Sequence, residues 1–313
     1  MILLLQYTLI FASVLLLVAL GGCFSEHSGV INIGLEGIMV MGALGGALMM
    51  KFLPDSTPAF GMILLVVLAA IALGVVYSLL LAVAAINFKA DQTLVGTAMN
   101  LLGTAAATVF VKAMNTAESV DNVSSTIQYI NAKKAFLVNL GGFEFNWFML
   151  LAALALVGSY VSLYKTRFGL RLMACGEHPQ AADSVGINVY RMRYAGVLIS
   201  GMLGGLGGIV YITAGVSEWK FENGVAGFGF LALAVMIFGQ WKPTRIALAA
   251  LLFGFCRALG NVYSGFDFLK ALNLPAATYN MLPYIISLVV LVFVSKKSRA
   301  PKAEGIPYDK GQR

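Results

Sequence analysis

The sequence has 313 residues, of which 59% are hydrophobic and 11% are charged, and its mean hydropathy is +0.86. Soluble domains carry about 25% charged residues, so a soluble fold of this size would have too little polar surface to cover itself. The composition excludes a cytosolic enzyme, a disordered chain and a small disulfide-linked secreted domain, and it indicates a membrane protein. The net charge of +7 comes from basic residues in a few short connections, which argues against nucleic-acid binding.

Apolar runs long enough to cross a hydrocarbon layer of about 30 Å make up most of the chain. Such runs favour helices over alternating barrel strands, so we predict an all-α polytopic membrane protein with about nine transmembrane helices, within limits of eight and ten. The membrane domain covers residues 1–295, and the basic tail, 296–313, is expected to be disordered. The predicted spans are 3–23, 29–50, 60–86, 92–112, 147–164, 194–214, 226–240, 245–262 and 280–295.

The first span ends on the sequence LGGC, at residues 20–23, which looks like a lipoprotein cleavage box. A signal peptide begins with positive charge, and residues 1–6 carry none. We therefore predict that the first run is retained as a helix. The three cysteines, Cys23, Cys175 and Cys256, lie far apart and fit neither a disulfide framework nor a metal site, so no metal is predicted.

Lys and Arg are distributed unequally between the two sides of the predicted bundle. Fourteen of the 21 lie on the side of the C-terminal tail, six lie on the other side, and Arg257 lies within a span. Basic residues accumulate on the cytoplasmic side of membrane proteins. We therefore predict that the N-terminus is outside the cell and that the C-terminus is cytoplasmic.

The second span combines polar residues with glycines. Asn32 and Glu36 are four residues apart and so share one helix face, while Gly29, Gly34 and Gly37 favour a broken helix. An ionisable residue inside the membrane costs about 2.5–3.5 kcal/mol on insertion scales, so it needs a partner or a polar cavity. A binding site in a broken helix and a hydrogen-bond clamp between helices explain this pattern equally well.

Two connections are long. Residues 113–146 are polar and are expected to form a small external lid. In the cytoplasmic connection, 165–193, Pro179 suits the first turn of a helix and Gly186 its end, so a helix of about two turns is predicted between them. Such a helix either inserts into a partner or serves as an ordinary amphipathic connector.

The span at 194–214 carries two overlapping G-x-x-x-G spacings, a pattern that is typical of close helix packing rather than of a binding site. The glycines are Gly201, Gly204, Gly205 and Gly208.

Motifs for catalysis are missing from the sequence. It contains no G-x-x-x-x-G-K-[ST], so any ATP-driven step needs a separate ATPase. It also contains neither H-E-x-x-H nor G-x-S-x-G, so we predict that the chain is not an enzyme.

Three segments together carry a resemblance to a known family. They are SGVINIGLEG at residues 28–37, GEHP at 176–179 followed by GIN at 186–188, and GFGFLALA at 227–234 followed by RALG at 257–260. In this order they resemble the membrane permeases of bacterial ABC importers in the branched-chain amino acid/ribose superfamily. The resemblance is nearest to the permeases that work with basic membrane protein-type, purine nucleoside binding lipoproteins. The turn WKPT, at 241–244, departs from the small polar turn of that family.

The resemblance implies the permease subunit of an importer in the bacterial cytoplasmic (inner) membrane, which moves a nucleoside-like solute into the cell. It implies three kinds of partner: a second permease, either a sister chain or a second copy, separate ABC ATPase subunits that use the ATP, and an external solute-binding lipoprotein. Riboflavin or a simple sugar is the alternative solute. An autonomous ion-coupled carrier is a less favoured alternative, and an intramembrane enzyme the least favoured.

The resemblance also suggests roles for individual residues. The ATPase is expected to dock on Glu177, His178, Pro179, Ala181, Ala182 and Gly186. The substrate pathway is expected to involve Asn32, Glu36, Asn100, Arg257, Phe228 and Phe230. Each pathway residue has a structural alternative: the amides bond a neighbouring helix, Arg257 reaches outward to the membrane surface or pairs with an acid such as Glu36, and the phenylalanines pack in the core or face lipid instead of forming a gate.

Overall fold

The helices follow the apolar runs closely. The computed structural model describes residues 2–54, 56–127, 136–141, 143–215, 219–266, 275–294 and 300–311. In this part of the chain, eight helices are long and apolar enough to cross a membrane, within the predicted limits. The main helices are α1 (Ile2–His27), α2 (Leu35–Phe52), α3 (Ala59–Ala82), α4 (Gln92–Glu118), α6 (Trp147–Lys165), α9 (Val189–Val210), α10 (Phe228–Phe238), α11 (Pro243–Val262) and α13 (Ala276–Val294). Two π-helical turns, Val83–Asn87 and Tyr211–Gly215, extend α3 and α9.

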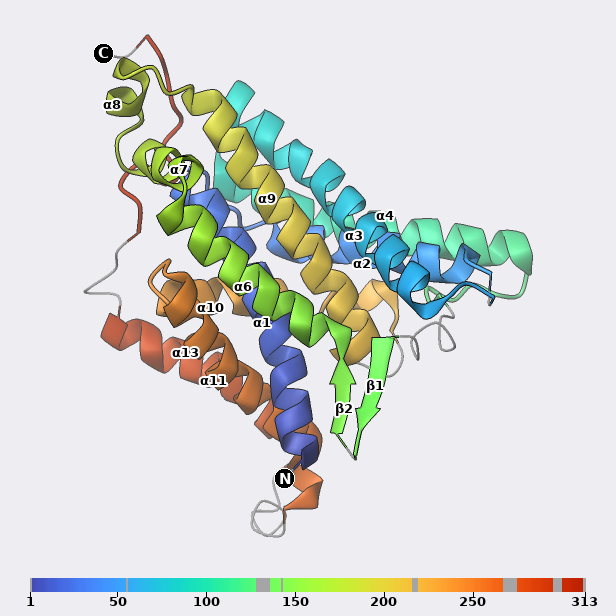
Figure 1. Ribbon diagram of the computed structural model, residues 1–313. Helices are drawn as coiled ribbons and strands as arrows, with labels where there is room; N and C mark the ends of the chain where they lie inside the picture. Colours follow the sequence, from blue (N-terminus) through green and yellow to red (C-terminus); the bar gives the residue numbers. More distant parts are fainter. Residues whose placement is uncertain are drawn as a thin grey trace.

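Helix α1 lies at the centre of the bundle (Figure 1). It is apolar on all sides and buried from Ile10 to Glu26, which is the pattern of a fully enclosed helix. Helices α9, α11, α6 and α10 pack around it. By contrast, α3, α4 and α6 each leave one face of large apolar side chains exposed, such as Leu68, Leu101 and Leu154, which is a surface suited to lipid.

The glycines of α9 allow three helices to meet at backbone distance. A Cβ atom added at Gly208 would lie 1.9 Å from the carbonyl oxygen of Met39 in α2. One added at Gly74 in α3 would lie 2.4 Å from the carbonyl oxygen of Gly201, and one added at Gly42 in α2 would lie 2.2 Å from the Cα atom of Gly205. Only hydrogen fits at these crossings, so α2 and α3 pack directly on α9.

We expect Gly208→Ala to lower the thermal stability of the purified chain, because the new methyl group forces α9 away from α2. Overpacking of this kind costs about 1–3 kcal/mol. Gly158→Ala in α6 is the matched control, since a Cβ atom there meets nothing within 4 Å. The measurement is the melting temperature in detergent, and equal values for the two variants would contradict close packing at Gly208.

The end of the bundle near α8, at the top of Figure 1, has more structure than the sequence indicated. The connection 165–193 contains the predicted short helix, α8 (Pro179–Ser184), but also a second helix, α7 (Arg167–Glu177). Thr166 caps α7 by accepting a hydrogen bond from the Gly169 backbone N–H, and α9 begins at Val189 instead of 194. We call this region the α8 end.

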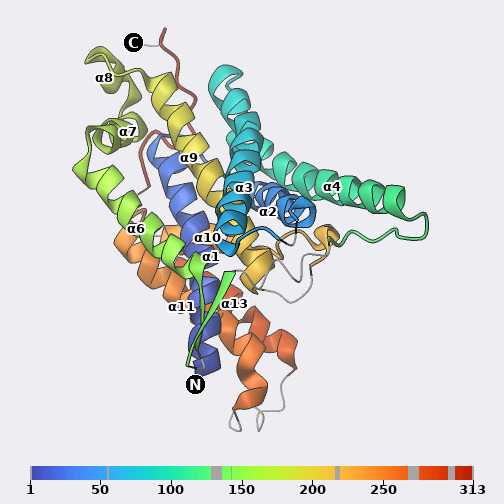
Figure 2. The same cartoon turned by 45° about the vertical axis from the view of Figure 1, so that its right-hand side comes forward.

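The structure describes the connection 113–146 over residues 113–127, 136–141 and 143–146. Helix α4 continues to Glu118, and an antiparallel hairpin that was not predicted joins β1 (Leu137–Leu140) to β2 (Phe143–Asn146), with Leu137 opposite Asn146 (Figure 2). Of the six Lys residues on the side of the N-terminus, Lys133, Lys134 and Lys270 lie outside the described residues.

The prediction of a disordered tail is wrong for residues 300–311. This segment lies across the α8 end, where Ala303 and Tyr308 are buried. Charge and Pro and Gly content indicate disorder, but Ala303 and Tyr308, between the charged residues, anchor the segment. Lys296, Lys297 and Arg299 lie outside the described residues.

Candidate functional site: a polar junction inside the bundle

The backbone between α1 and α2 is not helical. Helix α1 ends at His27, Gly29 has a left-handed φ of 92°, and α2 begins only at Leu35. The expected break thus falls at residues 28–34, with Gly37 already inside α2. Val30 and Asn32 in this break are fully buried, so its backbone needs partners from other helices.

Polar side chains of α4 supply those partners. The Asn100 side chain accepts a hydrogen bond from the Gly37 N–H through Oδ1 (2.8 Å) and donates one to the Ile33 carbonyl through Nδ2 (3.0 Å). Gln92 Oε1 accepts from the Ile31 N–H at 2.7 Å. These contacts replace the bonds that a continuous helix would have made.

Asn32 connects the same break to α9. Its Nδ2 donates to Ser200 Oγ at 2.8 Å, and its Oδ1 is buried without a hydrogen-bond partner in the described part of the chain. Ser200 and Gln92 were not identified from the sequence as candidate site residues. Polar residues within apolar helices are the signal that would have indicated them.

Glu36 binds the N-terminus of α10. Its Oε1 accepts from the Gly227 N–H at 2.8 Å and its Oε2 from the Gly229 N–H at 2.7 Å. Helix α10 is only 11 residues long and starts inside the bundle, because Gly224, Ala226 and Gly227 adopt left-handed φ angles just before it. A carboxylate is favoured there, where free N–H groups and the helix dipole are both positive.

Arg257 points inward, between two aromatic rings. Its guanidinium carbon lies 5.8 Å from the ring centre of Phe11 and 5.7 Å from that of Phe228, and its Nη1 donates to Asn280 Oδ1 of α13. Among the described residues no ion pair joins Arg257 to Glu36. The cation thus contacts two ring faces, the Asn280 amide and the Tyr211 hydroxyl.

The two phenylalanines of α10 do not lie together. Phe228 is buried against Phe11 and Tyr211, whereas Phe230 is 49% exposed on the outer face of the helix. We define the polar junction as the break at 28–34, the start of α10 and the residues that hold them: Gln92, Asn100, Ser200, Glu36 and Arg257.

Four of the six candidate docking residues lie on the surface of the α8 end. Pro179 and Ala182 are buried, and Glu177, His178, Ala181 and Gly186 are exposed. Gly186 follows the last turn of α8 and has a left-handed φ of 85°. Val185 beside it is 75% exposed, so α8 presents a small, partly apolar knob.

A second polar cluster lies beneath this surface and was missed from the sequence. Trp241, in the turn that departs from the family pattern, donates from its indole N–H to Glu26 Oε2 at 2.5 Å, and its carbonyl bonds His27 Nε2 at 3.0 Å. The carboxyl of Glu304 in the tail contacts that of Glu26. Nearby, burial raises the pKa of Cys175 to about 11, so this cysteine stays a thiol.

Burial raises the pKa of Glu304 above its usual value, although contact with Glu26 partly opposes this. The folded protein therefore prefers the neutral acid, and this contribution to stability is complete below about pH 4.3 and is lost as the pH rises through the raised pKa. We expect Glu304→Gln, which donates to Glu26 without a titrating proton, to gain in melting temperature over the native chain as the pH rises above about 4.3. Glu177→Gln, at an exposed site, is the control, and a pH-independent difference for Glu304→Gln would contradict the assignment.

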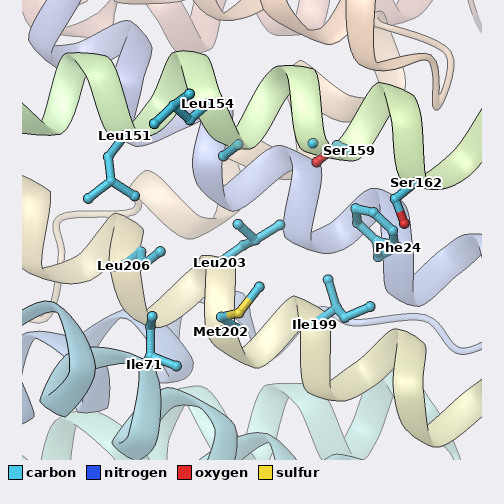
Figure 3. Close-up of a pocket in the computed structure, with 12 residues that line it drawn as sticks. Phe24, Ile71, Leu151, Leu154, Ser159, Ser162, Ile199, Met202, Leu203 and Leu206 are labelled. Atoms are coloured by element: carbon cyan, nitrogen blue, oxygen red, sulfur yellow. The ribbon is translucent and has the colours of Figure 1, made fainter.

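Two cavities in the described part of the chain lie away from the junction. An apolar cavity of about 380 Å³ lies between α6 and α9, where Figure 3 shows Leu151 and Leu154 facing Leu203 and Leu206. A polar cavity of about 410 Å³ lies near the end of α4, where Lys112 pairs with Glu222 at 3.2 Å.

Comparison with known proteins gives a consistent result. The model of the family described as "Branched-chain amino acid transport system / permease component" matches residues 4–295. The guanosine ABC transporter permease protein NupQ of Bacillus subtilis is 41% identical over 98% of this chain and 96% of its own length. The nucleoside ABC transporter permease protein NupC of Lactococcus lactis is 38% identical over 97% of this chain and 96% of its own length. The putative glucose ABC transporter permease protein TsgC13 of Haloferax volcanii is 32% identical over 82% of this chain and 76% of its own length.

Proposed function

The chain belongs to the permease family of branched-chain amino acid transport systems, and from this premise we propose that it is the membrane-spanning permease subunit of an ABC importer that moves nucleosides into the cell. The observation that carries the proposal is its similarity to two nucleoside permeases over almost the whole length of all three chains. Similarity to the putative glucose permease is lower and covers less of both chains, which disfavours a sugar.

The partners belong to the proposal as well. Two permeases, identical or sister chains, form the pathway, and separate ABC ATPase subunits supply the energy that this chain has no P-loop to obtain. A solute-binding lipoprotein delivers the nucleoside from outside. The chain lies in the cytoplasmic (inner) membrane with its N-terminus outside and the α8 end in the cytoplasm, which agrees with the distribution of Lys and Arg.

The proposal assigns ATPase binding to one region of the chain and the substrate pathway to another. At the cytoplasmic surface, α7 and α8 bind the ATPase through Glu177, His178, Ala181 and Gly186, which are exposed. In the membrane, the polar junction forms part of the pathway. Asn32, Asn100, Glu36 and Arg257 fix the break and α10, while Phe228 packs behind them and Phe230 lines the exposed face of α10.

The test is uptake of labelled guanosine by cells that lack the chromosomal gene and express it from a plasmid. We expect uptake to return with expression, and unlabelled purine nucleosides to compete while glucose and riboflavin do not. Competition by riboflavin or glucose alone would replace the proposed solute with that alternative.

A further inference from the structure

The C-terminal segment 300–311 bonds to three separate parts of the chain. The Ala303 N–H donates to the Gly176 carbonyl in α7 at 2.8 Å, and the Gly305 N–H donates to the Gly29 carbonyl at the start of the break at 3.3 Å. From α9, Arg193 Nη1 donates to the Ile306 carbonyl at 3.0 Å. In Figures 1 and 2 the red segment runs beside α7 and α8 toward the top of α1.

Side chains strengthen these backbone contacts. Tyr308 is buried, its ring meets that of Tyr190 edge to face at 5.3 Å, and the Arg193 guanidinium lies 6.0 Å from its centre. Asp309 pairs with Lys89, in the connection that precedes α4, at 2.9 Å. The segment thus also contacts the connection that leads into α4, three residues before Gln92.

Arg193 is a buried side chain that depends on contact with the segment 300–311. It is only 1% exposed, and within the described residues no carboxylate pairs with it. A buried guanidinium needs partners, and in the described part of the chain the Ile306 carbonyl accepts from its Nη1 and the face of Tyr308 lies over it, while Nε and Nη2 have no hydrogen-bond partner. Gly29 lies directly against the same side chain, because a Cβ atom added there would be 3.0 Å from Arg193 Nη2.

We propose that residues 300–311 act as a positioning clamp that joins α7–α8 to the polar junction, so that a movement of α7–α8 is passed to the break. The clamp holds Gly176, next to the docking residue Glu177, and Gly29, three residues before Asn32. A tail that only filled a groove on the surface would not need hydrogen bonds to both Gly176 and Gly29. The inference rests on the proposed function, because the movement that it transmits is the one imposed by the ATPase.

The experiment compares transport with ATP hydrolysis in the assembled importer, reconstituted with its ATPase, binding protein and second permease. The variants are a chain ending at Val294, Tyr308→Ala, and the matched control Tyr308→Phe, which keeps the ring on Tyr190 and Arg193. We expect the first two to retain ATPase binding and hydrolysis, while guanosine transported per ATP falls at least about fivefold, and Tyr308→Phe to retain at least about half of the native ratio.

An unchanged ratio in the truncated chain and in Tyr308→Ala would overturn the clamp. If the truncated chain does not accumulate, the two Tyr308 variants decide, and equal ratios for them count against the proposal. Failure of the proposed function is distinguishable, because the native chain would then show no ATP-driven guanosine uptake before any variant is compared.

Discussion

Glu36→Ala is expected to reduce guanosine uptake at least about tenfold at an unchanged amount of chain in the membrane. The substitution removes the acceptors of the Gly227 and Gly229 N–H groups and leaves one partly buried donor and one buried donor without a partner at the start of α10. Hydrogen bonds to a charged group contribute about 1.5–3 kcal/mol each, and about 1.4 kcal/mol is a factor of ten in an equilibrium, so α10 loses its fixed position.

Two further variants make this prediction specific. Glu36→Gln keeps one acceptor but turns an amide N–H₂ toward the other N–H group, so we expect an intermediate loss. Glu118→Gln removes a carboxylate whose side chain is 55% exposed and which pairs with Lys51, and it is expected to transport normally. Normal uptake by Glu36→Ala would exclude Glu36 from any part in transport.

Gly186→Pro is expected to reduce the amount of ATPase that copurifies with the permease at least about tenfold. Proline fixes φ near −65°, whereas Gly186 has a φ of 85°, and proline also removes the N–H that bonds the Asp183 carbonyl at 2.9 Å. The end of α8 must therefore be rebuilt, and Val185 moves with it.

Gly186→Asn is the matched control, because asparagine tolerates the left-handed conformation and keeps the N–H group. We expect it to retain at least about half of the bound ATPase. If Gly186→Pro copurifies with as much ATPase as the native chain, the docking role of α8 is wrong.

The transmembrane helices were predictable because a long apolar run crosses lipid as a helix. The span limits at 60, 92 and 147 agree with the starts of α3, α4 and α6 to within one residue. Helix α7 was not foreseen, because it is only 11 residues long and lies in a connection between two predicted spans, with Arg167, Arg171 and Glu177 among its apolar residues. The hairpin at 137–146 is too short to give a periodic signal.

The polar junction was predictable in composition but not in connectivity. Asn32, Glu36 and Asn100 stand out because they are polar residues in apolar spans, yet nothing local indicates that Glu36 meets the start of α10, 191 residues away. Trp241 illustrates the same limit. As a turn residue it had no evident role, and only the fold places it on Glu26.

The most direct test of the central claim is guanosine uptake into proteoliposomes that contain the permease pair, the ATPase and the binding protein. We expect uptake only when ATP is present on the side of the ATPase, no uptake when the ATPase cannot hydrolyse ATP, and none when this chain is omitted. Uptake by this chain alone, driven by an ion gradient without ATP, would show instead an autonomous carrier and would contradict the account.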